Sequence, residues 1–140
     1  MKILIAADGS DYTKHMLAYL AAHDEWLGSK HHYAVLTVVP GVPPRAAAVI
    51  AKADLAAYYA EEADKVFAPI RAFFKQNNID ATFQAEHGHA ADVIAAAADK
   101  GQYDLLMMGA HGHSTLANLV MGSVATKVLA QCGVPVLLVR

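Results

Sequence analysis

Three glycines and a serine near the end of the sequence have a spacing suited to binding phosphate. Gly109 and Gly112 are separated by two residues, and after nine further residues come Gly122 and Ser123. A glycine has no Cβ atom, so its backbone can approach a ligand closely and can adopt a positive φ. Gly122 and Ser123 fall near the start, or within the first turns, of a predicted helix, where free N–H groups, the helix dipole and a hydroxyl favour phosphate. These four residues therefore predict a phosphate site.

Asp8 is the second candidate, because it follows a short apolar run, residues 3–7, that is typical of a buried strand. Its carboxylate is an acceptor suited to a ribose hydroxyl or to a metal ion on the phosphates. The alternative is a structural role, in which a polar strand end caps the next helix; the glycine spacing favours the nucleotide role. Two other phosphate loops, G-x-G-x-x-G after the first strand and G-x-x-x-x-G-K-[ST], are absent from the sequence. Ser123 is not favoured as a nucleophile, because no Gly-x-Ser-x-Gly motif surrounds it.

Short apolar runs alternate with longer helical patterns along the chain. Strands are predicted at residues 3–7, 33–39, 79–86, 103–108 and 134–139. Helices are predicted at about 11–26, 46–76, 90–100 and 116–131, with a kink or break at Pro69. This alternation predicts an α/β fold with a parallel sheet covered on both faces. In such a sheet ligands bind beyond the carboxyl ends of the strands, where the strand order reverses.

Composition excludes several classes of protein. The chain has 140 residues, of which 56% are hydrophobic and 17% charged, and its net charge is −2. These values argue against disorder, and the single cysteine, Cys132, argues against a disulfide scaffold. The chain has no excess of Lys and Arg, so nucleic acid is not an expected partner. No apolar run approaches the roughly 20 residues that span a bilayer. A lone cysteine and no export signal predict a cytoplasmic protein.

The residues at the predicted strand ends resemble those of the universal stress protein family along the whole chain. The resemblance rests on residues 3–10 (ILIAADGS), 36–40 (LTVVP), 104–113 (DLLMMGAHGH), 121–129 (MGSVATKVL) and 134–140 (VPVLLVR). The glycine spacing is similar to the signature of the family's ATP-binding branch. The resemblance implies one domain over residues 1–140 with an adenine nucleotide α-hydrolase-like fold. That fold is an open, doubly wound sheet of five parallel strands in the order 3-2-1-4-5, with helices on both faces.

The same resemblance implies the ligand and its site. The ligand would be ATP, with Mg²⁺ or Mn²⁺. Asp8 would face the nucleoside and its ribose, and the backbone of Val38 would contact the adenine edge. The full set of implied binding residues is Ala7, Asp8, Ser10, Val38, Met108, Gly109, His111, Gly112, His113, Gly122, Ser123, Val124 and Ala125.

Two departures from the family concern charge and hydroxyl groups around the phosphates. Relatives often carry Arg or Lys where this chain has Ala110, His111 and His113, and a neutral histidine attracts phosphate less than arginine does. Ala125 stands where relatives often have Ser or Thr. The phosphate site is therefore expected to depend on backbone N–H groups and the helix dipole.

Eight histidines are an unusual number for this chain, and four of them form two His-Gly-His tripeptides. His87 and His89 follow the third predicted strand, whereas His111 and His113 follow the fourth. Imidazoles on one rim would suit zinc, nickel or copper. The implied strand order separates the two loops by roughly 14 Å, across three strand spacings of about 4.7–4.9 Å. We therefore predict no metal cluster, and interpret His111 and His113 as neighbours of the phosphates.

The final predicted strand, residues 134–139, is long and apolar, and an exposed edge strand of this kind invites pairing with another chain. The resemblance implies a homodimer through this strand. The leading hypothesis is a cytoplasmic, homodimeric, ATP-binding regulator of the stress response with at most slow hydrolysis, because no base to orient water and no arginine finger is visible. The alternatives are a nucleotide-independent module that binds an unknown protein partner, and a variant that binds AMP or cyclic AMP without hydrolysis. A phospho-accepting receiver domain is not favoured, because Asp8 has no adjacent acidic residue.

Overall fold

The computed structural model describes residues 1–113 and 120–140, and in these residues five strands form one parallel sheet. The strands are β1 (Lys2–Ala6), β2 (His32–Val39), β3 (Ala81–His87), β4 (Leu105–Gly109) and β5 (Val136–Val139). Their order is β3-β2-β1-β4-β5, and every neighbouring pair is parallel. The predicted fold class and strand order are therefore confirmed.

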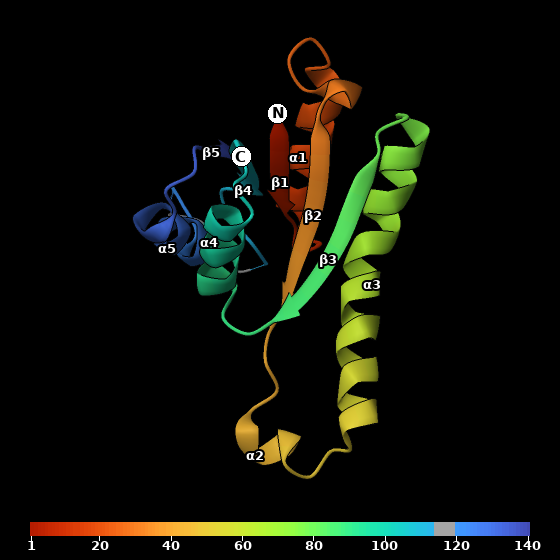
Figure 1. Ribbon diagram of the computed structural model, residues 1–140, viewed down its shortest axis with the longest axis vertical. Coiled ribbons are helices and arrows are strands. Elements are labelled where there is room, and N and C mark those ends of the chain that lie inside the picture. Colours follow the sequence, from red (N-terminus) through yellow and green to blue (C-terminus); the bar gives the residue numbers. More distant parts are fainter. Residues whose placement is uncertain (114–119) are drawn as a thin grey trace.

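Helices cover both faces of the sheet (Figure 1). Helices α1 (Asp11–Ala22) and α3 (Lys52–Gln76) pack on one face, and α4 (Ala90–Lys100) and α5 (Ser123–Gln131) pack on the other. Successive side chains of a strand point to opposite faces, so β1 contributes to both layers. Ile3 and Ile5 lie in the core beneath α1 and α3, whereas Leu4 and Ala6 lie in the core beneath α4 and α5. A strand buried on both faces explains why β1 is apolar at every position after Lys2.

The long helical pattern divides earlier than predicted. It forms a short helix α2 (Pro44–Ala47) and the helix α3, and α3 runs without interruption through Pro69. A proline removes one helical hydrogen bond, and here the carbonyl that loses its partner belongs to the exposed residue Lys65. The buried neighbours Phe67 and Ile70 hold this part of α3 against the sheet. Packing therefore outweighs the local cost of the proline: of the predicted kink or break at Pro69, the break does not occur.

The other boundaries differ by smaller amounts. Helix α1 ends at Ala22, four residues before the predicted end, and a short 3₁₀ helix, η1 (Gly28–Lys30), precedes β2. The predicted start of the last helix at residue 116 lies outside the described residues, but residues 120–122 are not helical and α5 begins at Ser123. Strand boundaries shift by about two residues, as is usual for such assignments.

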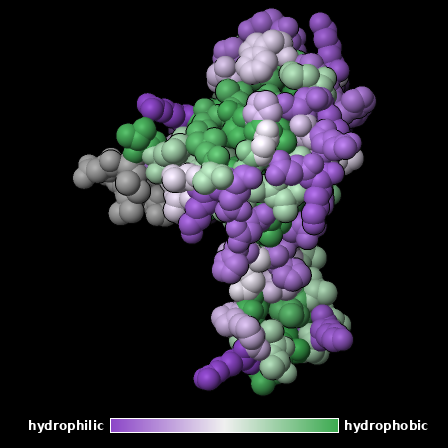
Figure 2. Space-filling model, turned by 60° about the vertical axis from the view of Figure 1, so that its left-hand side comes forward, coloured by the Kyte–Doolittle hydropathy of each residue, from purple (hydrophilic) through white to green (hydrophobic). Residues whose placement is uncertain are grey.

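An arm made of α2, its flanking loops and the first turns of α3 extends beyond the carboxyl ends of the strands (Figure 1). Its root is tied to the sheet by Tyr59, whose hydroxyl accepts a hydrogen bond from the Val42 N–H at 2.9 Å and whose ring stacks on His87 at 4.4 Å. Val49 and Tyr58 are exposed on the arm. Figure 2 shows hydrophobic residues, in green, at the surface of the lower lobe. No helix in the part of the chain that the structure describes is long and apolar enough to cross a membrane.

Candidate functional site

A cavity of about 230 Å³ opens at the carboxyl ends of β1 and β4. These two strands are neighbours in the sheet, and the chain leaves them for opposite halves of it, so the cavity lies where the strand order reverses. Open α/β sheets bind their ligands at this point. The position of the cavity therefore follows from the topology alone.

Twelve of the thirteen predicted binding residues line this one cavity. They come from the ends of β1, β2 and β4 and from the start of α5, segments that are far apart in the sequence. They are Ala7, Asp8, Val38, Met108, Gly109, His111, Gly112, His113, Gly122, Ser123, Val124 and Ala125. Ser10 is the exception. It is buried at the start of α1, outside the lining, and its backbone N–H donates to the Asp8 carboxylate at 2.9 Å.

The Asp8 side chain is held in place by Thr13, a residue that the sequence did not single out. The Thr13 hydroxyl donates to Asp8 Oδ1 at 3.1 Å and accepts from the backbone N–H groups of Asp8 and Gly9, both at 3.2 Å. Together with the Ser10 N–H, this hydroxyl gives Oδ1 two donors. The arrangement leaves Oδ2 directed at the glycine loop, where it lies 2.8 Å from the point at which a Cβ atom on Gly112 would stand.

The three glycines of the motif are explained by close packing rather than by backbone conformation. Gly109, Gly112 and Gly122 all have negative φ, so the positive φ that the sequence allowed is not found at these positions. A Cβ atom on Gly109 would lie 2.6 Å from the Cβ of Tyr12. A Cβ atom on Gly122 would lie 3.2 Å from the Ala110 carbonyl oxygen. Side chains at these points would push α1 and α5 away from the loop after β4.

The start of α5 is fastened to the loop after β4. The Gly122 N–H donates to the Ala110 carbonyl at 2.6 Å, and Gly122 is the residue that precedes the first helical residue, Ser123. The first hydrogen bond within α5 runs from the Thr126 N–H to the Gly122 carbonyl at 3.0 Å. N–H groups ahead of that bond are not used within the helix. They belong to residues 123–125, which line the cavity.

The two histidines of the loop take different positions. The Nε2 atom of His113 lies 2.7 Å from the Asp8 carbonyl oxygen, which can only accept, so Nε2 carries the proton. The ring of His111 packs against Tyr12, with the ring centres 5.0 Å apart. His113 therefore links the loop after β4 to the loop after β1, and His111 forms part of the wall beside α1.

The other two histidines of the His-Gly-His pairs lie elsewhere. His87 stacks on Tyr59 at the root of the arm, and His89 is exposed at the start of α4. Neither lines the cavity. Within residues 1–113 and 120–140, no group of three or more His, Cys, Asp or Glu side chains is placed to hold a metal ion.

Six lining residues were not predicted: Ala6, Tyr12, Thr13, Leu36, Ala90 and Ile94. Ala6 and Leu36 belong to continuous apolar runs, which mark them only as core residues of strands. Tyr12 and Thr13 carried one usable signal, since they lie in the first turn of the helix that follows Asp8. Ala90 and Ile94 belong to α4, whose start follows β3, and only its packing over β2 brings them to the cavity.

Comparison with known proteins identifies relatives of the whole chain. The family model described as the universal stress protein family matches residues 1–140. A universal stress protein of Thermus aquaticus is 34% identical over 142 residues, which cover 99% of this chain and 97% of that protein. A universal stress protein of Synechocystis is 45% identical over 53 residues, which cover 38% of this chain and only 18% of that protein.

Solved structures share the fold at lower identity. The universal stress protein UspA from Lactobacillus plantarum superposes with a TM-score of 0.78 at 19% identity, covering 100% of this chain and 97% of that one. An Arabidopsis thaliana family member with AMP bound has a TM-score of 0.70 at 13% identity, covering 99% of this chain and 90% of that one. A universal stress protein in complex with cAMP has a TM-score of 0.62 at 23% identity, covering 100% of this chain and 97% of that one. At these identities the likeness shows the fold.

Proposed function

Since the chain belongs to the universal stress protein family, we propose that it binds an adenine nucleotide in the cavity between β1 and β4. The observation that carries this proposal is the convergence of twelve predicted binding residues on one cavity at the point where the strand order reverses. Relatives of the same fold with AMP or cAMP bound support the choice of ligand class.

The chemistry of the lining supports one orientation of the nucleotide. Leu36, Val38, Met108 and Ile94 form an apolar wall that suits the adenine ring. The Asp8 carboxylate, held by its two donors, suits a ribose hydroxyl. The N–H groups at the start of α5, which make no hydrogen bond within the helix, suit the phosphates because the positive end of the helix dipole lies there.

Within this class, ATP carrying Mg²⁺ or Mn²⁺ is the ligand that the glycine signature favours, and AMP or cAMP is the alternative. Asp8 is the sole carboxylate among the described lining residues. Mg²⁺ is commonly held by one or two carboxylates together with substrate phosphates, so one carboxylate fits an ion that arrives with the nucleotide. The ion would lower the charge of the phosphates. We propose that the protein acts as a nucleotide-responsive regulator in the cytoplasm, as one domain over residues 1–140, rather than as a fast catalyst.

Nucleotide binding is tested directly on the purified protein. We expect mass spectrometry of the denatured sample to show co-purified adenine nucleotide, and calorimetry of nucleotide-free protein to show saturable binding of ATP, AMP or cAMP. GTP serves as the control for base recognition and should bind at least tenfold more weakly. Absence of binding by every adenine nucleotide would contradict the proposal and favour a module that binds only a protein partner.

We also propose a homodimer formed through β5. This strand is at the edge of the sheet, its residues 136–138 are half-buried, and Leu129 of the adjacent α5 is 42% exposed. Figure 2, which turns the side of α4, α5 and β5 forward, shows apolar side chains gathered there. Sedimentation over a range of concentrations should give the mass of two chains. A monomer that persists at every concentration would contradict the dimer without affecting nucleotide binding.

A further inference from the structure

We infer that the cavity selects its nucleotide by charge, and that it holds a nucleotide with a single phosphate group more tightly than ATP without a metal ion. This inference rests on the proposed function. It concerns which adenine nucleotide is bound and why, and it is carried by the charged groups that the cavity contains.

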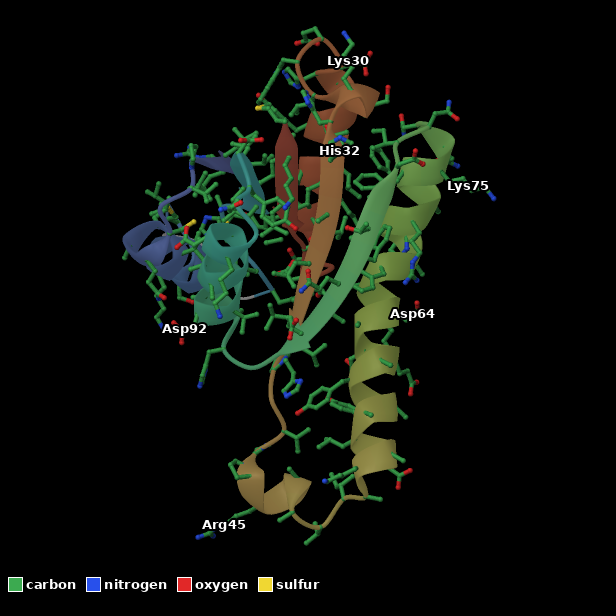
Figure 3. All side chains as sticks on the ribbon, in the orientation of Figure 1. Lys30, His32, Arg45, Asp64, Lys75 and Asp92 are labelled. Carbon is green, nitrogen blue, oxygen red and sulfur yellow. The ribbon has the colours of Figure 1, made fainter. Side chains whose placement is uncertain are left out.

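The described lining of the cavity has one side chain with a permanent charge, and that charge is negative. Among the lining residues that the structure describes, Asp8 is the only member of the set Asp, Glu, Lys and Arg. Residues 114–119, which follow His113 in the sequence, are STLANL and include no ionisable side chain. Figure 3 labels Lys30, Arg45 and Lys75, and all three extend outward from the ends of the molecule or from α3. No lysine or arginine among the described lining residues is available to neutralise a chain of phosphates.

The Asp8 carboxylate faces the side where the phosphates would lie. Its Oδ1 is occupied by the Ser10 N–H and the Thr13 hydroxyl, and its Oδ2 is directed at Gly112 in the glycine loop. A carboxylate held in this way cannot turn away without losing two hydrogen bonds. It attracts a ribose hydroxyl and repels an additional phosphate, since like charges at close range disfavour each other.

Positive potential in the cavity comes from weaker sources. The start of α5 offers the N–H groups of residues 123–125 and about half a unit of positive charge from the helix dipole. His111 and His113 offer hydrogen bonds, and one nitrogen of His113 is already committed to the Asp8 carbonyl. These sources match one phosphate group. Among the described lining residues, no cationic side chain meets the further charge of ATP, which a divalent ion would have to balance.

The test compares ligands that share adenosine and differ in charge. We expect calorimetry in the presence of a chelator to show that AMP and cAMP bind more tightly than adenosine, and that ATP binds roughly tenfold more weakly than AMP. Adding Mg²⁺ should narrow the difference between ATP and AMP, since the ion supplies the positive charge that the cavity lacks.

Added fixed charge should abolish the preference for AMP. His113→Lys places a cation at the rim, and Val124→Lys places one at the start of α5; each should raise the affinity for metal-free ATP relative to AMP by roughly tenfold. His32→Lys is the matched control, because His32 is exposed at the opposite end of the sheet (Figure 3) and should leave the ratio unchanged.

The outcomes separate this inference from the proposed function. Metal-free ATP that binds as tightly as AMP would overturn selection by charge while leaving adenine-nucleotide binding intact. A weaker affinity for ATP that neither added lysine changes would also overturn it, because charge would then not be the cause. Failure of every ligand to bind, adenosine included, would contradict the proposed function instead.

Discussion

Replacing Gly112 with valine should weaken nucleotide binding by at least about a hundredfold, or roughly 2.7 kcal/mol, while the protein stays folded. A Cβ atom at this position would stand 2.8 Å from Oδ2 of Asp8, closer than such atoms approach. Because Oδ1 is held by Ser10 and Thr13, the carboxylate cannot move aside freely. The valine must therefore either fill the space beside Asp8 or displace the group that suits the ribose.

Stability should change little, because Gly112 lies in a loop, has a negative φ and is not buried. We expect the free energy of unfolding in urea to stay within about 1 kcal/mol of the unaltered protein. Gly41→Val is the control, since a Cβ atom there meets nothing nearer than 3.9 Å and the residue lies outside the cavity. Normal nucleotide affinity in Gly112→Val would mean that the glycine spacing has another purpose.

Gly112 is a better position than Gly109 for this substitution, because side chains at the two positions would contact different groups. A side chain on Gly109 would press against Tyr12, and the Tyr12 residue belongs to the first turn of α1. A substitution there would confound a loss of binding with a shift of the helix. At Gly112 the contact is with a group of the site itself, so the loss of binding can be assigned to the cavity.

The layers of the fold were predictable because burial on both faces leaves an unambiguous pattern. Residues 3–7 and 105–108 are apolar throughout, as strands inside a parallel sheet must be, and both strands lie in the interior of the sheet here. The carboxyl ends of such strands carry the polar residues that a ligand meets. Asp8 and Gly109 were therefore predictable as neighbours as soon as their two strands were placed side by side.

The supports of the site were not predictable, because their roles depend on three-dimensional contacts. A threonine such as Thr13 is common in the first turn of a helix. Only the hydrogen bonds that its hydroxyl accepts from two backbone N–H groups show its role. The path of α3 through Pro69 was missed for a related reason, since local propensity is overridden by the burial of Phe67 and Ile70. The sequence allowed either close approach or a positive φ at the motif glycines, and only the structure shows that close packing is the reason for them.

Replacing Thr13 with valine should lower the free energy of unfolding by about 2 kcal/mol and weaken nucleotide binding as well. Valine has nearly the same shape, so the buried position, 5% exposed, keeps its packing. The change removes the acceptor of the Asp8 and Gly9 N–H groups and one of the two donors to the Asp8 carboxylate. Partly buried groups that lose their hydrogen bonds account for the loss of stability.

The two effects have separate controls. Thr82→Val makes the same chemical change at an exposed position of β3 and should alter stability by less than about 0.5 kcal/mol. Thr13→Ser keeps the hydroxyl and should recover most of the nucleotide affinity. A purely steric role for Thr13 would give the opposite result, because Thr13→Val keeps the shape of the side chain and would then bind normally. Urea denaturation measures the first effect and calorimetry with AMP the second. A Thr13→Val protein as stable as the unaltered one would show that the N–H groups of Asp8 and Gly9 find water, and that Asp8 is positioned by Ser10 alone.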